Sequence, residues 1–383
     1  MTAGAGTSPS TRRRPPDRRA HILTAAARRF WSEGYHQVSM AHIAADVGIG
    51  ASALYRHFRG KEELLLTVLD GQLSRMEADA ARAGDVIGAL AAIALDTREF
   101  GVLWEREAGH LPEEARRGLR HRIRGLAARI AAGLDGPEAT ANLRSWAVLS
   151  VLDSPSHHRV ELDRARFATI LHDASRAVAG VELPDEGGAV TAARPAGLRP
   201  ASRREALLAV AAQLFADRGY PSVGLDDIGA AAGIAGPSVY NHFASKADVL
   251  ASVLHRGNEA LWLTLHRDLA RASSPADALR RLAARYARFT AEQPEIVGVL
   301  MTEFIHLPAE RRDDFRRAQH DYVREWVALL RQDRPARDEA EALVRTHAAL
   351  AVINSLSRIH HLRARPGHVE RTAVLAAAAL ELD

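Results

Sequence analysis

Apolar side chains near the start of the chain recur at the three- and four-residue spacing that places them on one face of a helix. The first such face consists of Ile22, Leu23, Ala26, Ala27 and Phe30. We expect this helix to end at Gly34, and a second helix to run over residues 40–47. Gly48 then supplies a sharp turn, because glycine adopts positive φ without steric cost. A third helix over residues 51–58 and a fourth from Lys61 complete a predicted helix-turn-helix.

The same pattern occurs a second time. When the chain is shifted by 185 positions, residues 18–65 lie on residues 203–250 without a gap. The matched pairs include Phe30/Phe215, Gly34/Gly219, Tyr35/Tyr220, Val38/Val223, Ile43/Ile228, Gly48/Gly233, Ile49/Ile234, Tyr55/Tyr240, His57/His242 and Phe58/Phe243. The two lysines of the 383-residue chain, Lys61 and Lys246, also share one position, whereas arginine fills the other 49 basic positions. This pairing predicts an internal duplication in which both copies use a compact ammonium.

Both copies resemble the DNA-binding domain of the TetR family of transcriptional regulators. The elements that carry the resemblance are Phe30…Gly34-Tyr35, Ile43-Ala44…Gly48-Ile49 and Tyr55-Arg56-His57-Phe58…Lys61-Glu62, with their counterparts in the second copy. Leu111-Pro112 and Leu307-Pro308 each precede an arginine-rich amphipathic helix, so each half resembles a whole family member. The arrangement is similar to the tandem-repeat members of this family known from actinobacteria.

The resemblance implies an all-α fold in which each helix-turn-helix domain is followed by a helical-bundle regulatory domain and the two halves form an intramolecular pseudo-dimer. The expected boundaries are 1–16 for a disordered basic tail, 17–64 and 202–250 for the DNA-binding domains, 65–180 and 251–383 for the regulatory domains, and 181–201 for a linker rich in proline, glycine and alanine. The halves should pair through the alanine-rich helices expected at 138–152, 163–178, 338–358 and 368–382. Whether chains pair further, as a homodimer, stays open.

The resemblance also assigns DNA contacts. Tyr55 and Tyr240 are expected to approach the phosphate backbone, His57 and His242 to brace the helix end, and Lys61 and Lys246 to meet a phosphate from the start of the fourth helix. That helix start offers free N–H groups, so an ammonium there favours an anion. Phe58 and Phe243 are interpreted as core residues.

The bases should be read by the non-matching positions of the two third helices. These are Ala51, Ser52, Ala53 and Arg56 in copy one, and Gly236, Pro237, Ser238 and Asn241 in copy two. Arginine suits guanine and asparagine suits adenine, although either residue could contact phosphate instead. Because the two sets differ, we expect an asymmetric operator.

The two copies also differ in charge. Residues 1–61 carry a net +7 and residues 199–246 a net +1, although the whole chain is only +4. Ser39 can cap the second helix and reach a phosphate, whereas its counterpart Gly224 cannot. Gly50 and Ala235 stand where family members usually carry a serine or threonine cap. We therefore expect copy one to supply most of the salt-dependent DNA affinity.

Regulatory domains of the family usually enclose a small-molecule pocket between helices. The candidate lining residues are Trp104, His110 and Trp146 in half one, and Phe289, Phe304, His306, Tyr322 and Trp326 in half two. The segment around Glu303 resembles members that sense lipids or their acyl-CoA forms. A lipid or acyl-CoA-like effector that releases a repressor from DNA is therefore expected. Two alternatives remain open: a DNA-binding protein without effector, and a half two that acts mainly as a dimerisation module.

Composition limits the other classes of protein. The chain has no cysteine, and no apolar run is long enough to cross a bilayer, so we expect a cytoplasmic, nucleoid-associated protein. We find no nucleophile–base pair or phosphate-binding glycine loop, and predict neither an enzyme nor a cofactor. His157-His158 and His360-His361 are adjacent pairs whose side chains point in different directions on a helix, with no carboxylate recognised at ligand spacing, so no metal site is predicted.

Overall fold

The computed structural model describes residues 18–185, 198 and 200–382, and in these ranges every regular element is helical. The helices of half one are α1 (Arg18–Glu33), α2 (Met40–Asp46), α3 (Ala51–Tyr55), α4 (Lys61–Arg82), α5 (Val86–Ile93), α6 (Phe100–Val102), η1 (Leu103–Glu107), η2 (Ala108–His110), α7 (Glu113–Ala131), α8 (Glu138–Asp153), η3 (Ser154–His157) and α9 (Arg164–Gly180). The expected all-α fold is confirmed.

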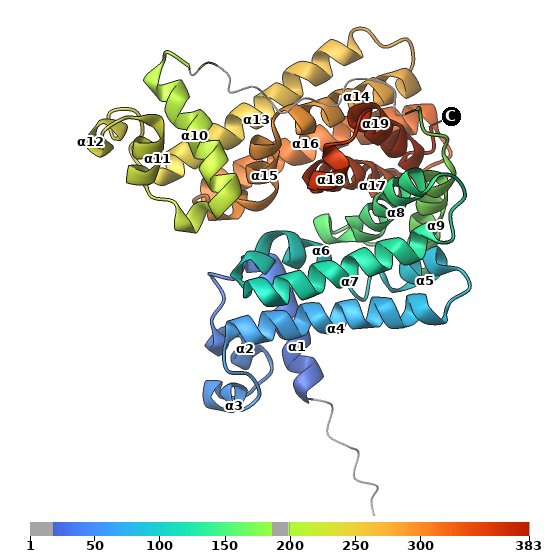
Figure 1. Ribbon diagram of the computed structural model, residues 1–383, viewed down its shortest axis with the longest axis horizontal. Coiled ribbons are helices and arrows are strands. Elements are labelled where there is room, and N and C mark those ends of the chain that lie inside the picture. The colour runs from blue at the N-terminus through green and yellow to red at the C-terminus, as the bar shows by residue number, and fades with distance from the viewer. Residues whose placement is uncertain (1–17, 186–197, 199, 383) are drawn as a thin grey trace, which may run out of the picture.

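Half two repeats this order. Its helices are α10 (Arg203–Arg218), η4 (Tyr220–Ser222), α11 (Leu225–Ala232), α12 (Gly236–Val239), α13 (Lys246–Leu269), α14 (Pro275–Glu292), α15 (Pro294–Thr302), η5 (Phe304–His306), α16 (Ala309–Asp333), α17 (Glu339–Arg358), α18 (His360–Arg363) and α19 (His368–Ala379). Figure 1 shows α1–α3 and α10–α12 as two separate units toward the same side, with α8, α9, α17 and α19 on the other.

Each helix-turn-helix unit has its own core. In copy one, Ile22 and Phe30 of α1 pack with Ile43 of α2 and Leu54 of α3, and all four side chains are fully buried. The apolar face predicted for the first helix is therefore the face that holds the unit together. The equivalent side chains of copy two form a second cluster of the same kind.

The two halves share a third core. Helices α8 and α9 pack against α17 and α19, and the buried cluster runs through both halves. Ala147 of α8 and Ala349 of α17 are fully buried in this core. Their small side chains let the helices approach closely. The predicted pairing of these four helices into an intramolecular pseudo-dimer is confirmed, with each helix boundary within four residues of its predicted position.

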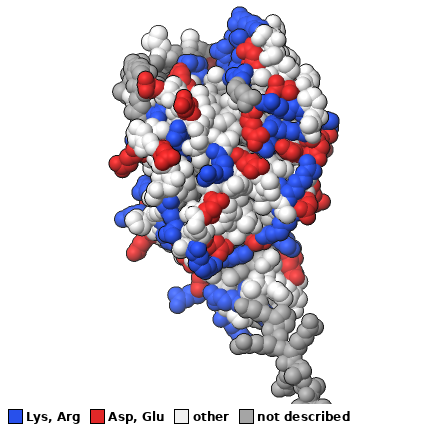
Figure 2. Space-filling model, turned by 90° about the vertical axis from the view of Figure 1, so that its right-hand side faces the viewer, with Lys and Arg blue, Asp and Glu red and all other residues white. Residues whose placement is uncertain are grey.

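Ionic contacts also join the halves. Arg166 of α9 lies 2.8 Å from the Asp338 carboxylate at the start of α17, and Arg358 of α17 pairs with Glu105 of η1. On the face shown in Figure 2, acidic and basic side chains are interspersed over the helical bodies. The expected tail at 1–16 and most of the linker at 181–201 lie outside the described residues.

Candidate DNA interface and ligand cavity

Helix α2 is bounded by Ser39 at its start and by the turn at Gly48 that leads to α3. Ser39 begins α2 and accepts a hydrogen bond on its Oγ from the His42 backbone N–H at 3.1 Å. Gly48 ends α2 with a φ of +66°, a conformation that favours glycine, and α3 starts three residues later. The cap and the turn predicted at these residues are both confirmed.

The third helices are shorter than predicted. Helix α3 ends at Tyr55 instead of residue 58, and α12 ends at Val239 instead of residue 243. The N–H groups of His57 and Phe58 share the Leu54 carbonyl, at 2.9 and 3.1 Å, so the last turn tightens and the helix stops. Gly50 and Ala235 begin α3 and α12 without a side-chain cap, as their sequence implied.

Exposure separates the aromatic residues of this region into two groups. Tyr55 is 54% exposed and Tyr240 is 59% exposed, whereas Phe58 and Phe243 are buried. The phenylalanines are therefore core residues, as interpreted, and both tyrosines are free to contact a partner. The remaining candidates at the surface, exposed or half-buried, are Ala51, Ser52, Arg56, His57, Ser238, Asn241 and His242. The Pro237 side chain lies outside the described residues.

An open groove of about 520 Å³ lies between the start of α2 and the start of α4. Its wall brings together Ser39, Tyr55 and Lys61, three residues that sequence reasoning assigned to phosphate binding. Arg59 lines the same groove and was not among the assigned residues. The sequence could have indicated Arg59 as a phosphate-binding candidate, because it is a basic residue between Phe58 and Lys61. The groove thus combines two cationic side chains with the hydroxyl groups of Ser39, Tyr35 and Tyr55, and the Glu62 carboxylate is its one acidic lining group.

The ammonium of Lys61 already has a partner within the protein. Its Nζ donates to the Tyr35 backbone oxygen at 2.8 Å and lies 4.4 Å from the centre of the Tyr35 ring. Lys246 does the same at Tyr220, with distances of 2.9 and 4.1 Å. Burial lowers the pKa of both lysines. Contact of either lysine with a phosphate stays a prediction. Such a contact would use the ammonium N–H groups that do not bond to the tyrosine backbone oxygen.

Copy two presents a more acidic surface at the matching place. Gly224 begins α11 without a side chain that could cap it, and its backbone N–H donates to the Asp227 carboxylate at 2.7 Å. Within the described part of copy two, residues 203–246 contain four basic and four acidic side chains. Residues 18–61 of copy one contain seven basic and two acidic side chains. An incoming phosphate therefore meets less positive charge at copy two.

Half one encloses a cavity of about 740 Å³ between α4, α5, α7 and α8. Trp104 and Trp146, two of the three ligand candidates in this half, lie on its wall. The third candidate, His110, is not part of the wall. Its ring stacks on Tyr35 with 4.4 Å between ring centres, so it joins the regulatory domain to the DNA-binding domain instead.

The candidates in half two pack against neighbouring side chains. Trp326 and Tyr322 are buried, and their rings lie 6.4 Å apart. His306 stacks on Tyr220 at 5.2 Å, repeating the His110–Tyr35 contact. Phe304 packs beside Phe315, and Phe289 lies against the shared core. None of the five belongs to the wall of the half-one cavity.

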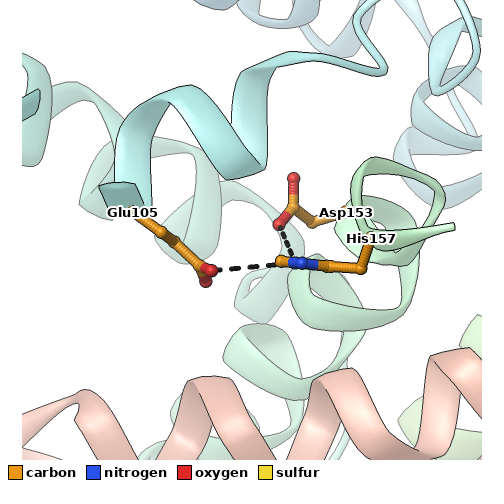
Figure 3. Close-up of side chains that lie close together, drawn as sticks. All are labelled: Glu105, Asp153 and His157. Atoms are coloured by element: carbon orange, nitrogen blue, oxygen red, sulfur yellow. Dashed lines mark ion pairs between the residues drawn. The ribbon is translucent and has the colours of Figure 1, made fainter. Parts of the chain in front are cut away.

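A cluster of ionisable groups lies on the cavity wall. Figure 3 shows His157 between Asp153 and Glu105, with its Nε2 3.7 Å from an oxygen of each carboxylate. The statement that no carboxylate lies at ligand spacing is wrong, because Asp153 is four residues before His157 on the same helical run. The carboxylates raise the pKa of His157 against the effect of its burial, which acts in the opposite direction. Arg358 also pairs with Glu105, and we assign no metal here.

Comparison with known families matches the chain three times. The model described as bacterial regulatory proteins, tetR family, matches residues 22–68 and again residues 207–253, and a tetracyclin repressor-like C-terminal domain matches residues 272–361. The chain belongs to the TetR family. It carries two TetR units in one chain, and the groove and both exposed tyrosines lie within the two matched DNA-binding segments.

Curated relatives of this TetR-family chain include two mycobacterial regulators. The chain is 32% identical over 135 residues to the transcriptional repressor KstR2 of Mycolicibacterium smegmatis, covering 35% of this chain and 66% of that protein. It is 44% identical over 54 residues to the transcriptional activator FasR of the same organism, covering 14% of this chain and 25% of FasR. The chain therefore spans just under two thirds of KstR2 and a quarter of FasR. Both are regulatory proteins rather than enzymes, in line with the sequence prediction.

A solved TetR-family regulator from Bordetella parapertussis aligns with this chain at 22% sequence identity and a TM-score of 0.43. The alignment covers 46% of this chain and 95% of the solved chain.

Within the described part of the TetR-family chain, the helices are too short or too polar to cross a membrane.

Proposed function

We propose that the protein is a DNA-binding transcriptional regulator that represses an asymmetric operator and is released by a small hydrophobic, lipid-like or acyl-CoA-like effector. The observation that carries this proposal is the groove beside α3, where Ser39, Tyr55, Arg59 and Lys61 converge. The two cationic side chains outnumber the one carboxylate of the lining, Glu62, and together with the hydroxyl groups of Ser39 and Tyr55 they suit a phosphate oxygen. The groove adjoins the exposed face of a helix-turn-helix, whose second helix enters the major groove in this class of DNA-binding unit.

One chain supplies both reading helices in this account. Arg56 is exposed just after α3 and Asn241 just after α12, so the two units offer different side chains to the bases. An arginine and an asparagine prefer different base edges. The chain therefore acts as a monomeric pseudo-dimer on two unlike half-sites, and the proposed place of action is the nucleoid in the cytoplasm. A homodimer of chains is the competing arrangement.

Effector control is supported by a direct connection between the cavity and α1. Ser156 lies on the cavity wall, and its backbone oxygen accepts a hydrogen bond from Trp31 Nε1 of α1 at 2.9 Å. Arg106, beside the wall residue Glu105, donates to the Phe30 backbone oxygen at the end of the same helix. A ligand that moves this wall moves α1, and with it the helix-turn-helix that α1 supports.

A second function is favoured by the smaller positive charge of copy two and by the packed side chains of half two. In that case half two serves mainly as a dimerisation module, and copy one alone reads DNA.

KstR2 is named a repressor and FasR an activator, so the direction of regulation is tested by transcription from the bound promoter.

The test starts with genomic fragments retained by the full chain, followed by binding of the enriched sequence to matched variants. Tyr55→Ala and Tyr240→Ala change side chains that are both more than half exposed, so neither should affect folding. We expect Tyr55→Ala to weaken operator binding by tenfold or more and Tyr240→Ala by a smaller but measurable factor. If Tyr240→Ala leaves affinity unchanged, the dimerisation-module function replaces the two-reader proposal. Retention of no specific sequence would contradict both.

A further inference from the structure

The half-one cavity is closed by residues of half two. Ser355 and Arg358 at the end of α17, with His361 of α18, complete a wall whose other side is built by α4, α5, α7 and α8. The Trp146 and His361 rings face each other across the junction of the halves, with 6.3 Å between their centres. A ligand in this cavity therefore contacts both halves at once.

Part of the cavity wall is apolar. Leu73, Leu90, Phe100, Trp104 and Trp146 contribute its surface. Its volume of about 740 Å³ lies in the range of pockets that bury most of a small organic ligand. The body of a matching ligand is hydrophobic.

A cationic stripe borders this apolar space. Arg116, Arg120 and Arg124 follow one another at four-residue intervals on α7, which places them on one face of that helix, and all three line the cavity. Arg116 and Arg120 pair with Glu113, whereas Arg124 has no carboxylate partner among the described residues. Arg124 of α7 and His361 of α18 both line the cavity, so the wall brings together one basic residue from each half. Of the two carboxylates on the wall, Glu105 pairs with Arg358, and both Glu105 and Asp153 lie 3.7 Å from His157 Nε2.

The corresponding interior of half two is occupied by aromatic side chains. Helix α16 follows Leu307-Pro308 as α7 follows Leu111-Pro112, and it carries the buried Tyr322 and Trp326. The ring of Tyr286 lies 6.4 Å from that of Tyr322, and its hydroxyl donates to Asn354 at 2.9 Å. The interior of half two therefore contains buried aromatic rings that lie next to one another.

We propose that the cavity binds one amphipathic anion per chain, with its apolar body between Trp104 and Trp146 and its anionic head between Arg124 and His361, at the junction of the two halves. This inference rests on the proposed effector control and specifies the ligand. The carboxylate of a fatty acid and the phosphates of an acyl-CoA share this chemistry. Because both halves hold the ligand, its binding changes their relative placement and thereby the spacing of the two reading helices.

The test measures ligand binding to the full chain by calorimetry, with tryptophan fluorescence as a second readout. The probes are dodecanoate, dodecanoyl-CoA and the uncharged 1-dodecanol. We expect one site per chain, and an affinity for at least one of the anions at least tenfold above that for the alcohol. The two anions distinguish a free acid from a coenzyme A ester. Two sites per chain, or equal affinity for the alcohol, would overturn the proposal.

Matched variants locate the head group. Arg124→Gln and His361→Ala change exposed side chains, and each should weaken binding of the favoured anion about tenfold while leaving 1-dodecanol unaffected. Arg117→Gln on the same helix is the control, because Arg117 is exposed and lies outside the wall. Unchanged anion binding in both test variants contradicts the head-group assignment. Operator binding by the ligand-free chain is measured in parallel: DNA binding without anion binding defeats this inference alone, and anion binding without DNA binding defeats the proposed function alone.

Discussion

The Lys61 ammonium lies 2.8 Å from the Tyr35 backbone oxygen and 4.4 Å from the centre of the Tyr35 ring. On its other side, the same ring stacks on His110 of the regulatory domain. Half two repeats the arrangement with Lys246, Tyr220 and His306. A column of three side chains therefore connects the start of the fourth helix to the regulatory domain in each half, and the compact lysine ammonium stands at its end.

Replacement of Lys61 tests this column. Lys61→Met removes the charged donor from the Tyr35 carbonyl, and we expect the free energy of unfolding to fall by about 1–2 kcal/mol. This loss is smaller than that expected for a fully buried charged hydrogen bond, because the ammonium is partly exposed. Lys61→Arg should recover less than half of the loss. Urea unfolding checks both values. Full recovery by arginine would show that charge alone matters at this position.

Stability should depend on pH through the stacked histidines. Burial lowers the pKa of His110 to about 4, with the charges of His36 and Lys61 adding to the effect. The unfolded chain takes up this proton near pH 6.5, so the stability contributed by neutral His110 is present above that pH and is lost as the pH falls toward 4.

Between pH 7 and pH 4.5, the free energy of unfolding should decrease by about 1–2 kcal/mol less in the His110→Gln variant than in the wild type. His121→Gln is the control, since His121 is exposed on α7. Equal pH profiles for wild type and His110→Gln would contradict the assignment of a neutral buried imidazole.

Salt dependence should identify the arginines that meet phosphates. Arg59 lines the groove beside Lys61, whereas Arg29 is held by Asp46 at 2.7 Å and by Glu33 at 2.9 Å. We expect Arg59→Ala to reduce the slope of log K against log salt concentration by about 1, and Arg29→Ala to leave it unchanged. Fluorescence anisotropy at several salt concentrations measures the slopes. A larger change for Arg29→Ala than for Arg59→Ala would place the phosphate elsewhere.

The Trp31–Ser156 hydrogen bond should carry the effector signal. Trp31→Phe keeps the aromatic ring but removes the Nε1 donor to the cavity wall. We expect operator affinity without ligand to stay within about threefold of wild type, a difference below about 0.7 kcal/mol. The loss of affinity on adding the effector should become smaller. An undiminished ligand effect would show that the signal takes another route, such as Arg106 to Phe30.

Sequence reasoning predicted the elements that depend on local pattern. The apolar face of α1, the cap at Ser39 and the glycine turn at Gly48 follow from spacing and backbone chemistry, and the repeat placed the apolar face and the glycine turn a second time. The end of α3 could not be placed in this way. It depends on how the buried Phe58 fits the core, which is a tertiary property.

The cavity shows where sequence reasoning ends. Trp104 and Trp146 were candidates by residue type, but Arg124 and His361 come together only because the two halves pack across the junction. His110 was a ligand candidate, and the structure instead places it on Tyr35. The relation between Asp153 and His157 was visible as a four-residue spacing, and was missed because only the adjacent histidine pair was considered.

The central claim is that one chain reads two unlike half-sites. The most direct measurement is the stoichiometry and affinity of the full chain on its selected operator, compared with two symmetrised operators in which either half-site is duplicated. The account predicts one chain of 41.6 kDa per operator and weaker binding to both symmetrised sequences. Two chains per operator, with a duplicated half-site bound as tightly as the natural sequence, would contradict it.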